Sequence, residues 1–127
     1  MYVELYSVIF AMNRLGDVEA YYDTYNGEFT DNEYAKTDFE SYIYVPKYDE
    51  VSIAKKFLKT SPDHSLKKYV NSIPEKNFLT NFWNILYKLN IDSEFKDFRE
   101  EEKKNIAIKW CEDNNIKFTT KFNRQKS

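Results

Sequence analysis

The feature of this chain that most constrains its fold is a pair of amphipathic helical patterns between Phe78 and Ile116, separated by a short break at residues 90–92. Apolar and aromatic residues recur there at spacings of three and four, which places each set on one face of a helix. These residues are Phe78, Phe82, Leu86, Leu89, Phe95, Phe98, Ile106 and Trp110. The pattern predicts two helices whose apolar faces form a core or a groove.

The size and composition of the chain predict one folded domain with a hydrophobic core. It has 127 residues, of which 42% are hydrophobic and 31% charged, and only two are glycine and three proline. These values are typical of globular proteins rather than of disordered ones. We expect a single domain over residues 1–122, followed by a basic tail at 123–127 that frays.

The first half of the chain combines a short helix with a β-hairpin. The spacing of apolar residues predicts a helix over residues 3–14, and the alternation that starts at Val18 predicts a half-buried strand to Asp23. Asn26-Gly27 is the dipeptide favoured in two-residue hairpin turns, so we expect a return strand from Glu28. Residues 31–40 are polar and either continue the strand or form a loop, and residues 41–45 predict a third strand.

Helices dominate the second half. The sequence predicts one helix over residues 49–58 and another that opens at Ser61-Pro62. A capping box at residues 72–75 predicts a third helix, from Glu75 to Leu89. Asp92 is expected to cap the last helix, and the alternation of Ile116, Phe118 and Phe122 indicates an edge strand. The order predicts an α+β fold: a small antiparallel sheet, made of the hairpin plus one or two strands, packed on a layer of four to five helices.

The residues needed for common catalytic sites are scarce. Cys111 is the only cysteine and His64 the only histidine, and the two isolated glycines cannot build a phosphate-binding loop. We expect Cys111 to lie in or near the core and His64 to be a surface residue. The sequence therefore predicts a non-enzymatic protein without cofactor or metal, although an enzyme with a carboxylate site stays open.

A single cysteine also fits a reducing compartment, because no internal disulfide can form. The apolar run at the N-terminus lacks a basic leading segment and is far shorter than the roughly 20 residues that cross a bilayer. We therefore expect no signal peptide, no membrane association and a cytoplasmic location.

Charge is distributed unevenly along the sequence. Residues 1–50 hold 11 acidic and 3 basic side chains, whereas residues 51–127 hold 10 acidic and 16 basic ones. Such a split can steer a charged partner to one face of a protein. The alternatives are that the two halves pair with each other in the fold, or that both are ordinary solvated surface.

The aromatic content suggests where a partner would bind. The chain has 11 tyrosines, and several of them lie in the strand region among acidic residues. Tyrosine with interspersed charge is common in protein interfaces, although a compositional bias toward tyrosine explains it equally well. The candidate partner-binding residues are Glu19, Tyr21, Asp23, Tyr25, Glu28 and Asp31, and the expected partner is a protein with a basic surface.

Nucleic-acid binding is the alternative. Basic residues alternate with aromatic ones near the C-terminal end of the sequence, which is a weak signal for a nucleic-acid surface. The candidate residues are Lys117, Lys121, Arg124 and Lys126. The sequence pI of about 5.5 argues against this alternative.

The chain resembles uncharacterised protein family 0158, a group of small bacterial proteins of unassigned function. The similarity rests on Tyr21, Asp23, Gly27 and Glu28 in YYDTYNGEF, on YIYVP, and on the spacing within FWNILYKL, FKDFR and IAIKWCEDNNI. The last three segments carry Phe82, Leu86, Phe95, Phe98, Arg99, Ala107, Trp110 and Ile116 at the spacing of the family.

Three positions depart from the family pattern. Asn77-Phe78-Leu79 replaces a Gly-Ala-Phe run, Phe95 replaces a common tryptophan, and Asn114-Asn115 replaces an Asn-Gly helix end. Asparagine tolerates the left-handed conformation that ends a helix. The resemblance implies a fold but no activity. We therefore hypothesise a protein-binding module of inhibitor, immunity or regulatory type in a bacterium or phage.

Overall fold

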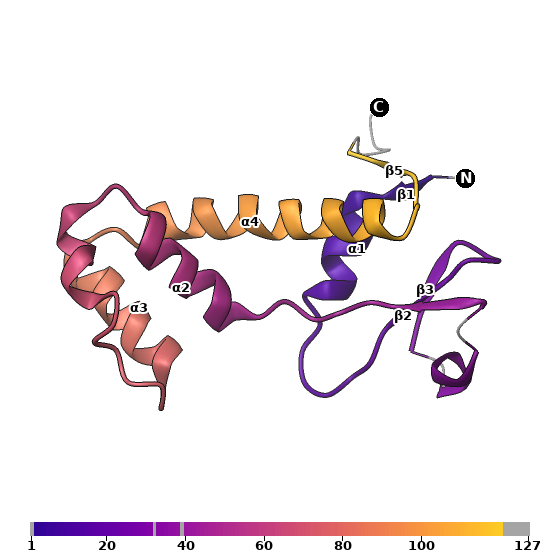
Figure 1. Ribbon diagram of the computed structural model, residues 1–127, viewed down its shortest axis with the longest axis horizontal. Coiled ribbons are helices and arrows are strands. Elements are labelled where there is room, and N and C mark those ends of the chain that lie inside the picture. Colours follow the sequence, from indigo (N-terminus) through magenta and orange to yellow (C-terminus); the bar gives the residue numbers. More distant parts are fainter. Residues whose placement is uncertain (1, 32, 39, 121–127) are drawn as a thin grey trace. The chain divides into compact units, whose positions relative to one another are not determined.

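The computed structural model describes residues 2–31, 33–38 and 40–120, without the side chains of residues 33 and 34. Its elements follow one another as shown in Figure 1. The chain divides into two compact units: unit 1 comprises residues 1–48 and 103–127, and unit 2 comprises residues 49–102. The sequence predicts a single domain over residues 1–122, and whether both units fold together as one domain stays a prediction.

Unit 1 begins with a strand and a helix. Strand β1 (Val3–Glu4) leads directly into helix α1 (Leu5–Met12), so the predicted helix is present but two residues shorter at each end. Strand β5 (Phe118–Thr119) pairs with β1 in parallel, with Val3 opposite Phe118. The expected strand near Ile116 is therefore found at 118–119, and its Phe122 end lies outside the described residues.

A three-stranded antiparallel sheet in unit 1 confirms the predicted hairpin and third strand. Its order is β3 (Glu28–Thr30), β2 (Tyr21–Asp23), β4 (Tyr42–Tyr44). Residues 33–37, between β3 and β4, form the 3-10 helix η1 (Glu33–Thr37). The buried ring of Tyr22 packs beside Phe29, with ring centroids 5.2 Å apart.

The turn of this hairpin differs from the prediction. Asp23 pairs with Glu28, so four residues connect the strands instead of the two that an Asn-Gly turn would give. Gly27 has φ +71°, but Asn26 is not among the described residues with positive φ. The carboxylate of Asp23 instead accepts hydrogen bonds from the loop, and these hold the wider turn.

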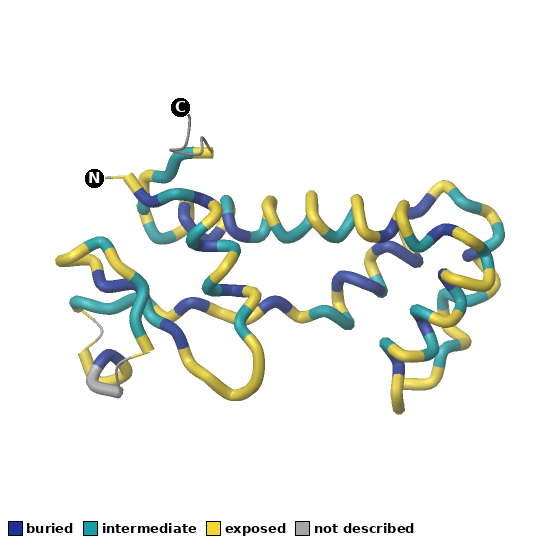
Figure 2. Tube along the Cα trace, turned by 180° about the vertical axis from the view of Figure 1, so that it is seen from behind, coloured by how far each residue is buried: buried dark blue, intermediate teal, exposed yellow. Residues whose placement is uncertain are grey.

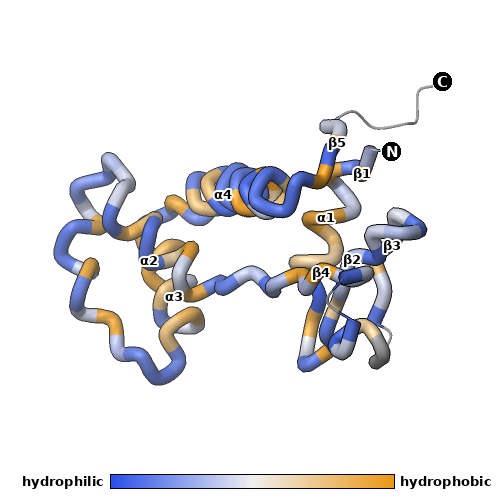
Figure 3. Tube along the Cα trace, turned by 45° about the vertical axis from the view of Figure 1, so that its right-hand side comes forward, coloured by the Kyte–Doolittle hydropathy of each residue, from blue (hydrophilic) through white to orange (hydrophobic). Residues whose placement is uncertain are grey.

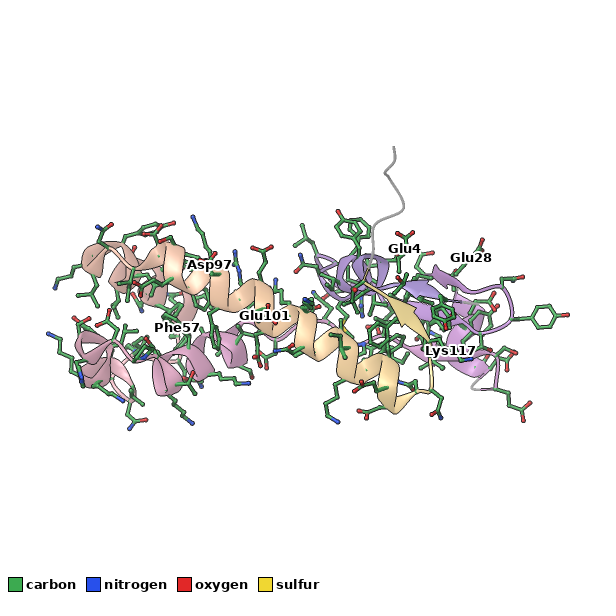
Figure 4. The ribbon with its side chains drawn as sticks, turned by 90° about the horizontal axis from the view of Figure 1, so that it is seen from above. Glu4, Glu28, Phe57, Asp97, Glu101 and Lys117 are labelled. Atoms are coloured by element: carbon green, nitrogen blue, oxygen red, sulfur yellow. The ribbon has the colours of Figure 1, made fainter. Side chains whose placement is uncertain are left out.

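Unit 2 is helical and has an aromatic core. It contains α2 (Glu50–Thr60), the 3-10 helix η2 (His64–Tyr69), α3 (Phe78–Leu89) and the first part of α4 (Asp92–Asp113). The ring centroid of Phe95 lies 4.8 Å from that of Phe82 and 5.2 Å from that of Phe57. Figure 4 labels Phe57 on α2. The helices predicted from apolar spacing thus form a core rather than a groove.

Two predicted helix starts in unit 2 are wrong. Asp63 rather than Ser61 caps the segment after α2, and that segment is a 3-10 helix instead of an α-helix. Helix α3 begins at Phe78, three residues after the predicted start at Glu75. Its N-cap, Asn77, adopts a left-handed conformation with φ 57°, which breaks the helical path that the capping box would need.

The fold is α+β, as the sequence predicts, with helices, the antiparallel sheet and the short β1–β5 parallel pair. Figure 2 shows the buried stretches of each unit in dark blue, among them residues of α2 and of the strands. Among the described residues, no helix is both long enough and apolar enough to span a bilayer.

Candidate functional site

Helix α1 is apolar on more than one side. Apart from Ser7 and the hydroxyl of Tyr6, the side chains from Leu5 to Met12 are apolar. Leu5 and Met12 are buried, whereas the side chains of Tyr6 and Phe10 are 61% and 74% exposed. Most of α1 carries the hydrophobic colour in Figure 3. A helix that is apolar all round is normally buried, so its outward aromatic residues mark a surface that another group can cover.

An open groove lies against this aromatic side of α1. Its volume is about 650 Å³, and apolar atoms make up most of its lining. Residues of α1, the segment before β2, and the end of β3 line it: Tyr6, Ser7, Phe10, Ala11, Arg14, Val18, Glu19, Ala20, Phe29, Thr30 and Asp31. The groove therefore belongs entirely to unit 1.

Packed aromatic rings support the sheet side of the groove. Phe29 lies 5.2 Å from Tyr22 and 6.4 Å from Trp110, measured between ring centroids. The indole N–H of Trp110, which is 8% exposed, donates a hydrogen bond of 3.1 Å to the carbonyl of Tyr44. These contacts fix Phe29 in place before any ligand arrives, which lowers the entropic cost of binding against it.

Arg14 is one of the residues that line the groove, and hydrogen bonds hold its side chain. Its guanidinium donates to the carbonyls of Val18 and Ala11, the latter at 3.1 Å, and to the Tyr44 hydroxyl at 3.4 Å. The carboxylate of Glu19 accepts a hydrogen bond from the Tyr44 hydroxyl. Burial and then this carboxylate raise the pKa of Tyr44 above its ordinary value, so the phenol stays neutral.

The six predicted partner-binding residues do not share one surface: two line the groove, and four lie in the strands and loop of the hairpin. Glu19 and Asp31 are exposed and line the groove. Tyr21 is half-buried, and its ring packs 5.6 Å from that of Tyr44. Glu28 is exposed at the start of β3, and Tyr25 in the hairpin loop is 86% exposed. Figure 4 labels Glu28 in this hairpin.

Asp23, the remaining predicted residue, stabilises the hairpin loop. It is 8% exposed, and its carboxylate accepts hydrogen bonds from the backbone N–H groups of Tyr25 and Asn26 and from the Asn26 side chain. The bond from the Asn26 backbone is the main reason why the pKa of Asp23 lies below its ordinary value. These bonds use the carboxylate inside the loop, so we assign Asp23 a structural role.

Lys117 is the one nucleic-acid candidate within the described residues. Its side chain is exposed, and its backbone carbonyl accepts a hydrogen bond of 2.9 Å from the Val3 N–H. Lys121, Arg124 and Lys126 lie outside the described residues. Nucleic-acid binding therefore stays a prediction.

The charge asymmetry of the sequence is not a difference between the two units. Unit 1 carries 11 acidic and 10 basic residues, and unit 2 carries 10 acidic and 9 basic residues. Residues from 103 onward, rich in lysine, share unit 1 with the acidic N-terminal half. Each unit has a balance of −1, so the steering of a partner depends on local groups such as those at the groove.

Cys111 and His64 lie where the sequence predicts, in the core and at the surface respectively. Cys111 is a fully buried free thiol, and burial raises its pKa to about 11, which suppresses nucleophilic reactivity. His64 is exposed at the start of η2. Across the described part of the chain, no cluster of His, Cys, Asp and Glu residues has the arrangement of a metal site.

Sequence reasoning missed Tyr6 and Phe10 as candidate surface residues. The apolar spacing predicts the helix over residues 3–14, but a single buried stripe does not account for all of its apolar residues. The sequence Leu-Tyr-Ser-Val-Ile-Phe-Ala-Met has apolar residues on every side, and that signal could have identified a second exposed face.

Comparisons with known proteins do not add a functional assignment. No family model matches the chain, no curated protein matches it, and no solved structure matches it. The resemblance to uncharacterised protein family 0158 therefore stays a prediction.

Proposed function

We propose that this chain is a protein-binding module whose groove between α1 and the end of β3 accepts an apolar partner segment flanked by basic residues. The observation that carries the proposal is the exposure of Tyr6 and Phe10 beside an apolar groove. Exposed apolar surface of this kind, with charged residues at its edge, is typical of interaction sites.

The apolar contribution to binding follows from the exposure of the two aromatic rings. Full burial of a Phe-sized side chain contributes about 1.5–3 kcal/mol. Phe10 is 74% exposed and Tyr6 61% exposed, so covering both would contribute about 2–4 kcal/mol in total. That is a minority of the roughly 8 kcal/mol of a micromolar complex, so the partner must also contact the walls of the groove.

The carboxylates at the groove favour a basic partner over an acidic one. Glu19 and Asp31 are both exposed there, and Glu19 accepts a hydrogen bond from the Tyr44 hydroxyl on one side of the groove. The cation of Arg14 donates to backbone carbonyls and lies 5.9 Å from the Tyr44 ring. Exposed charge pairs contribute about 0.2–1 kcal/mol each. The two carboxylates therefore set orientation and selectivity, while the apolar contacts provide most of the affinity.

A random peptide library displayed on phage tests the proposal directly. Selection on the wild-type protein should enrich peptides with two or more apolar or aromatic residues and an excess of Lys and Arg. These peptides should lose about tenfold in affinity for Phe10→Ser, because that substitution removes about 1–2 kcal/mol of apolar burial. Enrichment of acidic peptides, or of none, would contradict the proposal.

A matched substitution controls for general loss of aromatic surface. Tyr87 in α3 is 58% exposed, close to the value for Tyr6, but it does not line the groove. Tyr87→Ser should therefore leave the affinity of the selected peptides unchanged, whereas Tyr6→Ser should lower it. Equal losses in both variants would show that binding does not use the groove.

The proposed cellular role is that of a protein that acts by binding another protein. An inhibitor, immunity or regulatory protein of a bacterium or phage would use such a groove without chemistry of its own. The buried free thiol of Cys111 supports a reducing location such as the cytoplasm.

A further inference from the structure

We infer that Asn26-Gly27 is a spontaneous deamidation site that the hydrogen bonds of Asp23 keep closed in the folded hairpin, and that its conversion loosens the hairpin irreversibly. Three properties of the loop support this: its sequence, its exposure, and the hydrogen bonds of the two groups that react. Asp23, Asn26 and Gly27 do not line the groove, so the site is separate from the surface on which the proposed function rests.

An asparagine followed by glycine can cyclise through its own backbone. The backbone nitrogen of Gly27 gives up its proton to hydroxide and attacks the side-chain carbonyl carbon of Asn26. The bond from that carbon to Nδ2 breaks, and the nitrogen leaves as ammonia after it takes up a proton from water. One water molecule then opens the succinimide ring to aspartate or isoaspartate. Because glycine has no Cβ, residue 27 hinders the attack less than any other residue would.

The loop is accessible to the other reactants. Asn26 is exposed and Gly27 is half-buried. Hydroxide and water can therefore reach the amide, so burial alone does not protect this dipeptide. Any protection in the folded protein has to come from the bonds within the loop.

Hydrogen bonds occupy both the nucleophile and the leaving group. The Gly27 N–H donates to the backbone carbonyl of Asp23 at 2.8 Å, so the proton that must be removed is already bound. The side-chain Nδ2 of Asn26 donates to the Asp23 carboxylate at 2.8 Å, and the Asn26 backbone N–H donates to the same carboxylate at 3.1 Å. The reaction removes that proton and expels Nδ2, so the bonds of both groups must break in its course.

Opening of these bonds limits the rate in the folded protein. The net contribution of one hydrogen bond corresponds to a factor of about 2–10 in an equilibrium constant. Two bonds that must open together should therefore slow the reaction by about tenfold or more relative to an unfolded chain.

Conversion of Asn26 removes a donor from the loop and adds a charge. A carboxylate oxygen takes the place of the nitrogen that donates to Asp23, and an ionised carboxylate cannot donate. Two like charges then face each other where an amide and a carboxylate were paired. In isoaspartate the main chain also runs through the side-chain carbon, which displaces the N–H groups of the loop. Because the ammonia has left, the amide does not form again.

Deamidation rates of the full chain test the inference. Folded wild type and a synthetic peptide of residues 21–30 would be kept in the same neutral buffer, and mass-spectrometric peptide mapping would follow the conversion of Asn26. We expect the folded protein to react at about one tenth of the peptide rate or more slowly. Asp23→Ala should raise the rate toward that of the peptide, with circular dichroism to verify that the variant is folded.

Val8→Ala is the matched control for lost stability. Val8 is fully buried in α1, so its truncation destabilises unit 1 but leaves the hydrogen bonds of Asp23 in place. Asn26 should react in this variant at close to the wild-type rate. Reaction of folded wild type as fast as the peptide, or an equal acceleration in Val8→Ala and Asp23→Ala, would overturn the inference.

Asn26→Asp tests the consequence of the reaction, because it places the aspartate product in the loop from the start. Its urea midpoint should lie below that of wild type, and Asn26→Ala, which removes the donor without adding a charge, should lie between the two. A midpoint of Asn26→Asp equal to or above that of wild type would show that conversion does not loosen the hairpin.

Discussion

Replacing Asp23 by alanine should destabilise unit 1, because this carboxylate organises the loop between β2 and β3. It accepts hydrogen bonds from the backbone N–H groups of Tyr25 at 2.9 Å and Asn26 at 3.1 Å, and from the Asn26 side-chain amide at 2.8 Å. Asp23 is 8% exposed, whereas Tyr25 and Asn26 are exposed, so the three hydrogen bonds are only partly shielded from water.

The expected loss follows from comparable interactions. Removing an aspartate that caps backbone N–H groups costs about 0.5–2 kcal/mol, and a hydrogen bond to a charged group contributes about 1.5–3 kcal/mol. Because the three hydrogen bonds share one carboxylate, we expect their joint loss to lower the free energy of unfolding by about 2 kcal/mol. Asp23 also pairs with Glu28 across the strands, and relief of that like-charge contact returns about 0.5 kcal/mol. The net destabilisation is about 1.5 kcal/mol, or about 5 °C in melting temperature.

Urea unfolding of a Trp83→Phe background would measure this loss through the remaining tryptophan, Trp110, whose ring lies 6.3 Å from that of Tyr22. Glu28→Ala is the matched control, because Glu28 is the exposed acidic partner of Asp23 in the strand register. It should change stability by no more than about 0.5 kcal/mol, with a small gain expected. Equal stability of wild type and Asp23→Ala, or an equal loss in both variants, would refute the reasoning.

The contribution of Asp23 also depends on pH. Hydrogen bonds, first of all the one from the Asn26 backbone, lower the pKa of Asp23 in the folded protein. Because the folded pKa is depressed, the stabilisation is present above the unfolded value of about 3.9 and is lost as the pH falls through the folded pKa. The difference in stability between wild type and Asp23→Asn should therefore shrink below about pH 4.

The remaining predictions concern the core and the two units. Phe95→Ala should cost about 4 kcal/mol in urea unfolding, since Phe95 is 1% exposed, whereas Phe95→Leu should cost less than about 2 kcal/mol; similar values for both would contradict a tightly packed cluster. Cys111 should resist a thiol reagent at about pH 8 until the chain unfolds, because its thiol is buried and its pKa is raised to about 11; rapid native-state labelling would refute this. Trp83 reports on unit 2 and Trp110 on unit 1, so single-tryptophan variants should show coincident transitions if residues 1–122 are one domain, and separate transitions would reject that prediction.

Local patterns predicted the elements well where apolar spacing and packing agree. The aromatic spacing over residues 78–110 identified α3 and α4, because Phe82, Phe95 and Trp110 are all buried in the fold. Asparagine was also correctly expected to accommodate a helix end, since Asn115 has φ 58° just after α4.

Boundaries were wrong where one side chain competes with a standard motif. The Asn-Gly dipeptide favours a two-residue turn, but the hydrogen bonds of Asp23 stabilise a four-residue loop. The capping box at residues 72–75 favours an early helix start, but Asn77 turns left-handed and delays the helix to Phe78. Neither outcome follows from the motif alone, because each depends on a neighbouring residue outside it.

The candidate site was predicted only in part, because it depends on contacts between distant parts of the sequence. Glu19 and Asp31 were identified from composition, but their shared position at one groove requires β2 and β3 to pair. The parallel pairing of Val3 with Phe118 likewise has no local signal. Tyr6 and Phe10 were accessible to sequence reasoning, since no amphipathic pattern could bury every apolar residue of α1.

The central claim, that the groove beside α1 binds an apolar and basic segment, is tested most directly by an NMR titration. A peptide selected on the wild-type protein would be added to the isotope-labelled full chain, and the perturbed amides would be mapped. The account predicts changes concentrated at residues 6–14 and 29–31, and their loss in Phe10→Ser. Changes confined to the hairpin tip around Tyr25, or to α3 around Tyr87, would contradict it.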